Sequence, residues 1–395
     1  MRTSLTAVAL LLSGCDGGSE DLKSAVSSGK TVAVAKALHD LGAVVSFDGR
    51  NRLRRIDLSP QAAFLDQTFT DQDLRQLERF ARTGNLDDLE ELDLAVSSIT
   101  DAGLEHLSAL NGLNRLGLRR TAISDLGMRY LRDLSQLEKL DLGGTQITTA
   151  GLKQLHPLLR LKHLQLDATK LTDGSLVHLA AFPELETLVL RQVPITGEGF
   201  KHLGRLSHLT SLDASATKLN NIGMRRIVHL RHLKRLDLRE SWVTNEALRY
   251  LVELPDLTEL VLSRTEIGDA GLLHLEHLGS LQSLELDTTN VSDHGLKSLE
   301  KLGQLKKLTM RSTRISDRGF NHIRHLGNLE ILDLWDTQVT DDGLKQLYGL
   351  SCLRQLWLFG TRVTEVGVAE IQDAIPGVVI DGPSTAPGSK YPVTP

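Results

Sequence analysis

The chain is poor in aromatic residues, in cysteine and in excess charge, and each shortage argues against a class of protein. Aromatic residues make up 4% of the 395 positions while leucine dominates the apolar ones, which favours one repeated element over a globular enzyme core. The 45 basic and 50 acidic residues nearly cancel, so no strong field attracts a nucleic-acid backbone. Cys15 and Cys352 are too few and too far apart for a disulfide framework.

The first residues have the layout of an export signal. Arg2 precedes an apolar run from Leu5 to Leu12, which is too short to span a bilayer. A short apolar run after an early cation suits the core of a secretory signal. The run closes with small residues and a cysteine, LSGC at 12–15. This ending resembles the lipobox of bacterial lipoproteins.

The lipobox resemblance implies a covalent membrane anchor. It implies cleavage before Cys15 and acylation of the cysteine thiol and of the new amine. Asp16 follows the cysteine, which under the sorting rule of enterobacteria implies retention at the inner membrane. We therefore expect a signal peptide at 1–14 and a lipidated linker at 15–20. Membrane contact would then be made through the lipid alone, on the periplasmic side or at the cell surface.

A 24-residue repeat fills most of the chain. Twelve units follow one another without insertion, and each has Leu eight and five residues before one reference position. That position holds nine Thr, two Ser and one Val, and two residues later each unit has Ile, Val or Leu. We name these reference positions the hydroxyl column: Ser97, Thr121, Thr145, Thr169, Val193, Thr217, Ser241, Thr265, Thr289, Thr313, Thr337 and Thr361.

The consensus of the unit, LxxLxLxxTx(I/V)TDxGLxxLxxL, resembles the leucine-rich repeat family. The resemblance runs from about Leu53 to Ile371. The TDxGLxxL half is similar to the cysteine-containing subclass known from F-box adaptor proteins. Here Thr replaces the Cys of that subclass, and no F-box precedes the repeats. Fold-level likeness to such adaptors says nothing about the identity of a partner.

The periodicity of the unit independently predicts one strand and one helix. The alternation of Leu332 and Leu334 indicates a strand with one buried face, whereas Leu344, Leu347 and Leu350 are spaced as one face of a short helix. Neither element can bury its apolar face alone, so neighbouring units must stack. Because helices are wider than strands, we expect an α/β horseshoe. Its parallel sheet would line the concave face and its short helices the convex face.

Two columns predict structural roles. Hydroxyl groups in a buried turn can bond the backbone locally, and Val193 should lose that bond. Six residues after the hydroxyl column stand ten Gly, with Ser175 and Ala247. A positive φ would be costly for Ser or Ala, so close approach of adjacent turns explains this column better. In one repeat, Thr340 suits a helix N-cap and Asp341 suits the positive end of the helix dipole.

The flanks of the repeats read as caps. We expect an amino-terminal cap at 21–50, formed by a helix and a strand at Val44–Phe47, to cover the first open edge. Leucine-rich repeats would occupy 51–374 as one irregular unit and twelve regular ones. A terminal strand would follow at 375–381. The Pro- and Gly-rich residues 382–395 should be disordered.

Two of the three tryptophans fall on adjacent units of the expected concave face. Strand alternation points Trp335 outward, and Arg311, one unit earlier, could stack on it. The third, Trp242, should lie on the rim. An exposed aromatic cluster with charged neighbours is typical of an interaction hot spot, although surface scatter or cover by the carboxy-terminal tail would explain it too. The expected contact residues are three apolar anchors and three charged residues that orient a partner: Trp335, Trp357, Phe359, Arg311, Asp333 and Asp287.

The sequence thus favours a non-catalytic recognition scaffold on the bacterial cell envelope that binds a protein partner and uses no cofactor. A glycan- or peptidoglycan-binding module is the first alternative, since Trp beside carboxylates also suits sugars. An enzyme or metal protein is a weaker one. Asp333 and Asp336 could form a carboxylate pair, and His274 and His277 have one-turn spacing, but no further ligand or nucleophile is evident. A structural spacer without a partner is a further alternative.

Overall fold

The chain divides into two compact units, residues 1–193 with 205–208 and residues 194–204 with 209–395. A computed structural model describes part of each unit. The described residues are 38, 43–50, 52–59, 69–82 and 86–382. Several expected features therefore lie outside them: the signal peptide at 1–14, the lipidation site Cys15, the linker at 15–20, all but one residue of the helix in the amino-terminal cap, and the tail beyond residue 382.

Seven strands of the first unit are hydrogen-bonded side by side in sequence order. The first strand runs antiparallel to the second, and the remaining pairs are parallel. The strands are β1 (Val44–Phe47), β2 (Leu53–Asp57), β3 (Glu91–Asp93), β4 (Arg115–Gly117), β5 (Lys139–Asp141), β6 (His163–Gln165) and β7 (Thr187–Val189). The helices are α4 (Asp71–Arg82), α5 (Asp101–Leu104), η1 (Glu105–Ala109), α6 (Met128–Leu131), α7 (Thr149–Gln154) and η2 (Asp173–Ala181).

The second unit continues the pattern with parallel strands throughout its described part. Its strands are β8 (Ser211–Asp213), β9 (Arg235–Asp237), β10 (Glu259–Val261), β11 (Ser283–Glu285), β12 (Lys307–Thr309), β13 (Ile331–Asp333), β14 (Gln355–Trp357) and β15 (Val379–Asp381). Its helices are α8 (Asn221–Ile227), η4 (Asn245–Glu253), α9 (Asp269–Leu272), η5 (Leu275–His277), α10 (Asp293–Leu296), η6 (Lys297–Leu299), η7 (Asp317–Gly319), α11 (Phe320–Ile323), α12 (Asp341–Lys345) and α13 (Glu365–Ala374). In sequence, η3 (Glu198–Arg205) falls at the boundary between the units.

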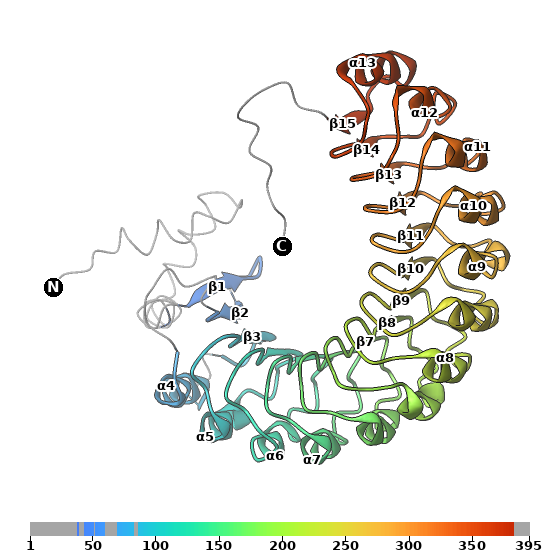
Figure 1. The fold of residues 1–395 in the computed structure, drawn as a ribbon. Coiled ribbons are helices and arrows are strands. Elements are labelled where there is room, and N and C mark those ends of the chain that lie inside the picture. The colour runs from blue at the N-terminus through green and yellow to red at the C-terminus, as the bar shows by residue number, and fades with distance from the viewer. Residues whose placement is uncertain (1–37, 39–42, 51, 60–68, 83–85, 383–395) are drawn as a thin grey trace, which may run out of the picture. The chain divides into compact units, whose positions relative to one another are not determined.

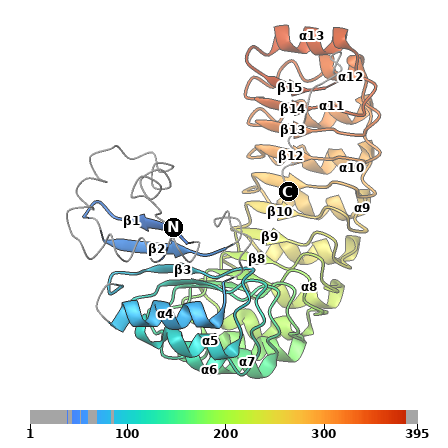
Figure 2. The ribbon, with the colours of Figure 1, turned by 90° about the vertical axis from the view of Figure 1, so that its left-hand side faces the viewer.

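In each unit the strands form one face and the helices the opposite face (Figures 1 and 2), which we name the strand face and the helix face. The core lies between them and consists mainly of leucine, as in the fully buried Leu332, Leu334 and Leu344. Each such side chain stabilises the fold by about 1.5–3 kcal/mol relative to an exposed one. The predicted α/β repeat solenoid is confirmed at this level. The expected strand at Val44–Phe47 is β1, which pairs with β2 and so covers its edge.

Many helices are of the 3-10 type, which the sequence analysis did not anticipate. In η2 and η4 the whole nine-residue helix is 3-10, and elsewhere short α and 3-10 segments follow one another, as in α5 and η1. A 3-10 helix has three residues per turn, so leucines three apart lie on one line along it. The spacing of the leucines already contained this signal.

The hydroxyl column behaves as predicted. In eleven of the twelve units the Thr or Ser hydroxyl donates a hydrogen bond of 2.5–2.7 Å to the carbonyl oxygen three residues earlier. Thr337, for example, donates to the Leu334 carbonyl and is 5% exposed. Val193 is fully buried and has no hydroxyl for this bond. In several repeats the same carbonyl also accepts the backbone N–H of the column residue, as Leu142 does from Thr145, and the Val193 repeat keeps this backbone bond.

Thr340 is the N-cap of α12, as predicted, and successive repeats are also joined by a column of acceptors that the sequence did not reveal. Asp341 does stand in the first turn of α12, but its carboxylate also accepts hydrogen bonds from the backbone N–H (2.8 Å) and the hydroxyl (2.6 Å) of Thr364 in the next unit. Asp317 accepts the corresponding bonds from Thr340. We name these acceptors the bridging column: Asp71, Asp101, Asp125, Asn221, Asn245, Asp269, Asp293, Asp317 and Asp341.

The glycine column is explained by close approach to the bridging column. A Cβ atom on Gly343 would lie 2.2 Å from the Asp317 Oδ1 atom, and one on Gly367 would lie 2.1 Å from the Asp341 Oδ1 atom. Neither glycine has a positive φ. Positive φ values of 51–75° occur instead at the residue just before each member of the hydroxyl column. That residue is glycine in only two units, Gly144 and Gly360.

We predict that Val193→Thr raises the free energy of unfolding by about 0.5–1 kcal/mol, because the new hydroxyl reaches the Leu190 carbonyl as its counterparts do. The reciprocal change in the preceding unit, Thr169→Val, removes an equivalent bond to Leu166 and should lower the free energy of unfolding by a similar amount. Urea denaturation of both variants measures the two effects. Destabilisation by both changes would contradict the assignment.

Candidate binding surface

The strands of the second compact unit are in register, so equivalent side chains of successive 24-residue repeats form rows on its strand face. Thr309, Asp333 and Trp357 are paired neighbours at the ends of β12, β13 and β14. Two residues after each strand end a second row begins, which includes Arg311 and Trp335. Because the strands are parallel and in register, residues 24 apart lie side by side. All six expected contact residues therefore come from four consecutive units.

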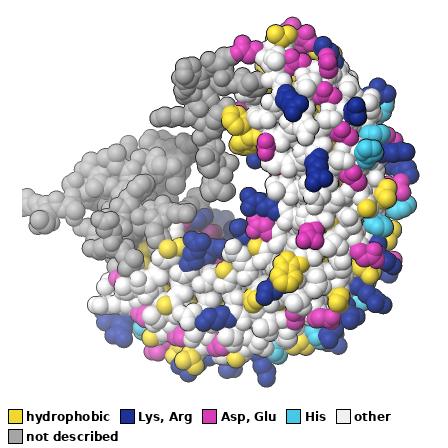
Figure 3. All heavy atoms as spheres, viewed as in Figure 1, with side chains coloured by type: hydrophobic (Ala, Val, Ile, Leu, Met, Phe, Trp, Pro, Cys, Tyr) yellow, Lys and Arg dark blue, Asp and Glu magenta, His cyan; other side chains and the backbone are white. Residues whose placement is uncertain are grey.

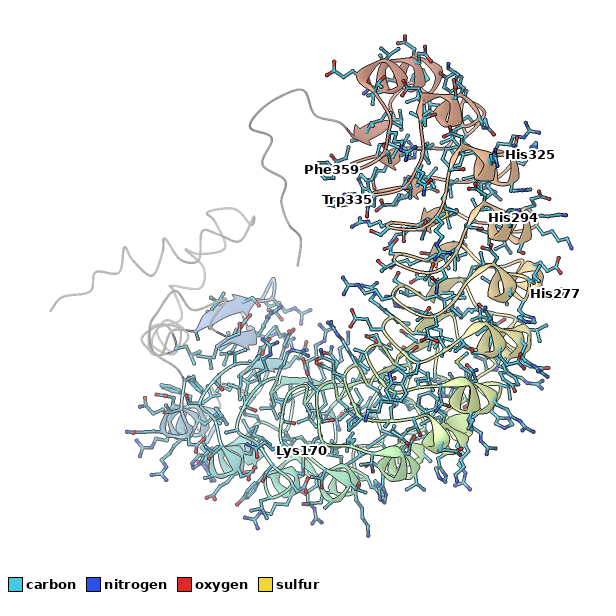
Figure 4. The ribbon with its side chains drawn as sticks, in the orientation of Figure 1. Lys170, His277, His294, His325, Trp335 and Phe359 are labelled. Carbon is cyan, nitrogen blue, oxygen red and sulfur yellow. The ribbon has the colours of Figure 1, made fainter. Side chains whose placement is uncertain are left out.

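Three aromatic side chains lie near one another at this place, and we name Trp335, Trp357 and Phe359 the aromatic patch. Trp335 is 40% and Phe359 46% exposed, and Trp357 is half-buried. The Trp335 and Phe359 rings are 5.3 Å apart between centroids and nearly perpendicular, at 81°. Figure 4 shows both side chains next to each other on the strand side, and Figure 3 shows hydrophobic side chains gathered there. Edge-to-face pairs of this kind stabilise by about 0.5–1.5 kcal/mol beyond area burial.

Arg311 joins the two tryptophans. The centre of its guanidinium group lies 5.1 Å from the Trp335 ring centroid and 5.3 Å from the Trp357 centroid. Cation–π contacts within about 6 Å are attractive. The Arg311 Nε atom also donates a hydrogen bond to the Asp333 carboxylate. Planar stacking and directed donation require a guanidinium, so lysine could not replace it without loss.

Asp333 lies beneath Arg311 and is fully buried, although alternation alone suggested an outward-facing contact residue. Its other carboxylate oxygen accepts the backbone N–H of Trp335 at 3.1 Å. Burial raises the pKa of Asp333, and the Trp335 N–H and Arg311 oppose that rise. Asp333 is therefore not itself part of the exposed surface, and its role is to hold Arg311 and Trp335 in position. The raised pKa could not be predicted from the sequence, because it results from burial of Asp333 by the neighbouring repeats.

The remaining acidic residues support the same turns. Asp287 accepts the backbone N–H of Arg311 at 2.9 Å, and its own backbone N–H donates to the Ser263 hydroxyl. Asp336 is exposed and accepts a hydrogen bond of 3.0 Å from the Ser312 hydroxyl. Asp333 and Asp336 thus have separate partners. Asp333 is bonded to Arg311 and to the Trp335 backbone N–H, and Asp336 to the Ser312 hydroxyl, so the two carboxylates do not form a pair.

The strand face of the first unit is polar by comparison. Arg119 donates two hydrogen bonds, of 2.7 and 2.5 Å, to the Asp167 carboxylate two units away. Gly143 lies beneath this pair, where a Cβ atom would be 2.5 Å from the Arg119 Nη1 atom. A hollow of about 560 Å³ opens beside the pair, and burial raises the pKa of Asp141 in its wall. No aromatic patch forms among the residues lining this hollow.

The histidines lie mainly on the helix face, as Figure 4 shows for His277, His294 and His325. His322 is hydrogen-bonded to Glu300, and the His156 and His178 rings are 5.2 Å apart. Among the described residues, no group of three or more His, Cys, Asp or Glu is placed to hold a metal ion. The same part of the chain contains no helix long and apolar enough to cross a membrane.

Comparisons with known proteins agree with this fold. Residues 135–155, 229–252 and 253–275 match the family described as Leucine Rich repeat. No curated protein matches the chain by sequence. Proteins built from such repeats are generally recognition scaffolds, and many bind other proteins.

Two solved structures have similar backbones. An internalin from Listeria monocytogenes aligns with a TM-score of 0.60 and 23% identity, over 76% of this chain and 82% of the internalin. A leucine-rich-repeat protein from Leptospira interrogans aligns with a TM-score of 0.59 and 18% identity, over 88% of this chain and 98% of that protein. At such low identity the likeness concerns the fold alone. Together with the matching repeats, it establishes a leucine-rich-repeat solenoid.

We predict that Asp333→Asn changes the pH dependence of stability. Since the folded-state pKa of Asp333 is raised, the native chain binds more protons than the unfolded chain between the two pKa values. The contribution of Asp333 is therefore fully present below the unfolded-state pKa and is lost as the pH rises through the folded-state pKa. Asparagine does not titrate, so over this rise in pH the free energy of unfolding of the variant should increase relative to that of the parent.

Urea denaturation of both proteins across a pH series from acidic to neutral measures this difference. Asp336→Asn, which removes an exposed carboxylate from the same turn, is the matched control. A difference between Asp333→Asn and the parent that stays constant across the series would contradict the prediction.

Proposed function

We propose that this chain is a non-catalytic recognition scaffold that binds a protein partner through the aromatic patch on the strand face of its second unit. One observation carries the proposal: three neighbouring aromatic side chains are partly exposed, the Trp335 and Phe359 rings touch, and Arg311 lies against both tryptophans above the buried Asp333. Hot spots in protein interfaces are enriched in Trp and Arg and lie in well-packed clusters. Side chains fixed before binding lose less conformational entropy on binding.

The arrangement favours a protein partner over a sugar at this patch. Arg311 lies against both the Trp335 and the Trp357 rings, and the Trp335 ring also meets Phe359. These contacts occupy ring surface on which a sugar would stack. What remains exposed is an apolar surface made by several side chains together, which suits an apolar anchor of a protein partner.

The test is affinity capture from solubilised cell envelopes with the full chain and with a Trp335→Ala/Trp357→Ala/Phe359→Ala variant. Species captured by the parent should be lost with the variant, and the Kd of an identified partner should rise at least thirtyfold, about 2 kcal/mol. Arg311→Lys should weaken binding in the same direction because it keeps the charge but loses the planar stack. Circular dichroism checks that each variant is folded.

The matched control removes apolar side chains that are more exposed than the aromatic patch from the helix face of the same compact unit, in an Ile222→Ala/Val252→Ala/Leu273→Ala variant. This variant should capture the same partner as the parent. Identical capture by the parent, the aromatic-patch variant and the control would contradict the proposal. Loss with the helix-face variant alone would move the binding surface to the other face.

We further propose that the protein is exported and anchored to a bacterial membrane by a lipid on Cys15. The support is the order of signals in the sequence: Arg2, the apolar run from Leu5 to Leu12, and the LSGC ending. This location would put the recognition surface on the cell envelope.

Labelling with an alkyne-modified fatty acid in a bacterial host tests the anchor. The full chain should incorporate the label and fractionate with membranes, and Cys15→Ser should abolish both. Cys352→Ser, which removes the exposed cysteine of the last regular unit, is the control and should behave as the parent. Label retained by Cys15→Ser, or absent from the parent, would refute lipidation at this residue.

A further inference from the structure

The third tryptophan stands apart from the aromatic patch, on a rim of the second unit. Trp242 is 61% exposed, the most exposed tryptophan of the chain, and follows the hydroxyl-column residue Ser241. Its backbone N–H donates a hydrogen bond of 2.9 Å to the Leu219 carbonyl, which fixes its position on the rim. The Lys218 ammonium group of the preceding unit lies 5.7 Å from the ring centroid. A single exposed aromatic residue is common on protein surfaces, so the case for a site here depends on what surrounds the ring.

A hollow of about 710 Å³ opens beside this indole, within the size range of small-molecule sites. Its lining comes from the Trp242 unit and the two units that follow, and does not include Lys218. Lys218 therefore approaches the ring from the side of the preceding unit, and the hollow extends toward the following ones. The lining residues are Glu240, Ser241, Trp242, Arg264, Thr265, Glu266 and Thr288.

The backbone beneath the hollow is held rigidly. Glu240, Arg264 and Thr288 occupy the positive-φ position of three successive units, with φ of 56, 58 and 54°. The backbone N–H of each donates to a carbonyl of the next unit, as from Arg264 to Asp287 at 2.7 Å. These bonds fix the backbone from which the lining side chains start.

The polar groups around the indole offer both donors and acceptors. The Arg264 guanidinium donates to the Glu240 carboxylate at 2.7 Å, and both side chains are largely exposed. Glu266 and Thr288 are exposed and make no side-chain hydrogen bond or ion pair with any other described residue. Counting Lys218, two cations and two anions surround the ring, so the local charges cancel. A neutral ligand rich in hydroxyl groups would meet no net field here.

We propose that this rim hollow binds a neutral carbohydrate, with one face of a sugar ring stacked on Trp242 and its hydroxyl groups bonded to Glu266, Arg264 and Thr288. A pyranose has an apolar face of C–H groups and an edge of hydroxyl groups that donate and accept hydrogen bonds. The hollow likewise has one apolar ring beside polar side chains that donate and accept. Trp242 is the sole apolar side chain among its seven lining residues. An apolar side chain of a protein partner would have only Trp242 to contact here, whereas the aromatic patch offers three apolar side chains.

The experiment titrates the full chain with chitotetraose, cellotetraose and maltotetraose, followed by saturation-transfer NMR and calorimetry. At least one of the three should bind with saturation transfer to its ring protons. Trp242→Ala should weaken that binding about tenfold or more, because it removes the stacking surface. Trp242→Tyr should retain most of the affinity, and Glu266→Gln should lose several-fold by replacing a charged acceptor with a neutral amide.

The aromatic-patch variant Trp335→Ala/Trp357→Ala/Phe359→Ala is the control and should bind the same sugar as the parent does. This control separates the rim hollow from the proposed protein-binding surface, since either site can fail while the other holds. Absence of binding by all three tetrasaccharides, or equal binding by Trp242→Ala and the parent, would overturn the proposal. Loss of sugar binding with the aromatic-patch variant alone would place the carbohydrate at the aromatic patch instead.

Discussion

In most repeats, a side chain of the preceding repeat accepts a hydrogen bond from the residue at which the helix begins. The first N–H groups of a helix have no hydrogen-bond acceptor within the helix itself, whether they are exposed or buried. In this chain the partner is supplied from the preceding unit by the bridging column, as when Asp317 accepts the backbone N–H and the hydroxyl of Thr340. The bond spans 23 residues of sequence, so a unit of another length would misplace the acceptor. Helices this short are unstable in isolation and persist because neighbouring units complete them.

The same constraint explains why other columns tolerate so little change. Asp317 closely approaches the helix of the next repeat, and Gly343 leaves the space that the Asp317 carboxylate occupies. The turn on the strand side is closed by the hydroxyl of Thr337 bonding the Leu334 carbonyl. A positive φ precedes it even where the residue is not glycine, as at Asp336 with φ of 55°. Non-glycine residues in this conformation carry strain, which the inter-unit hydrogen bonds compensate.

The inward and lateral positions are taken by these contacts, whereas the outward rows of the strand face differ between repeats. There the chain differs strongly from place to place. Arg119 and Asp167 satisfy each other across Gly143 in the first unit. Arg311 in the second unit instead lies against two tryptophans, with Asp333 beneath it. A uniform scaffold can thus present an ion-paired surface in one unit and an apolar anchor in the other.

Much of this architecture was predictable from the sequence, because the same residue types recur at equivalent positions in twelve repeats. The hydroxyl column, the close approach at Gly343 and the outward direction of Trp335 all follow from periodicity and local chemistry. What the tertiary structure alone decided are contacts between repeats: the full burial of Asp333, its raised pKa, the hydrogen bond that Thr364 donates to Asp341, and the hollow beside Trp242. Periodicity fixes which face a residue takes, whereas burial and hydrogen-bond partners depend on side chains 24 and 48 residues away, brought together only when the units stack.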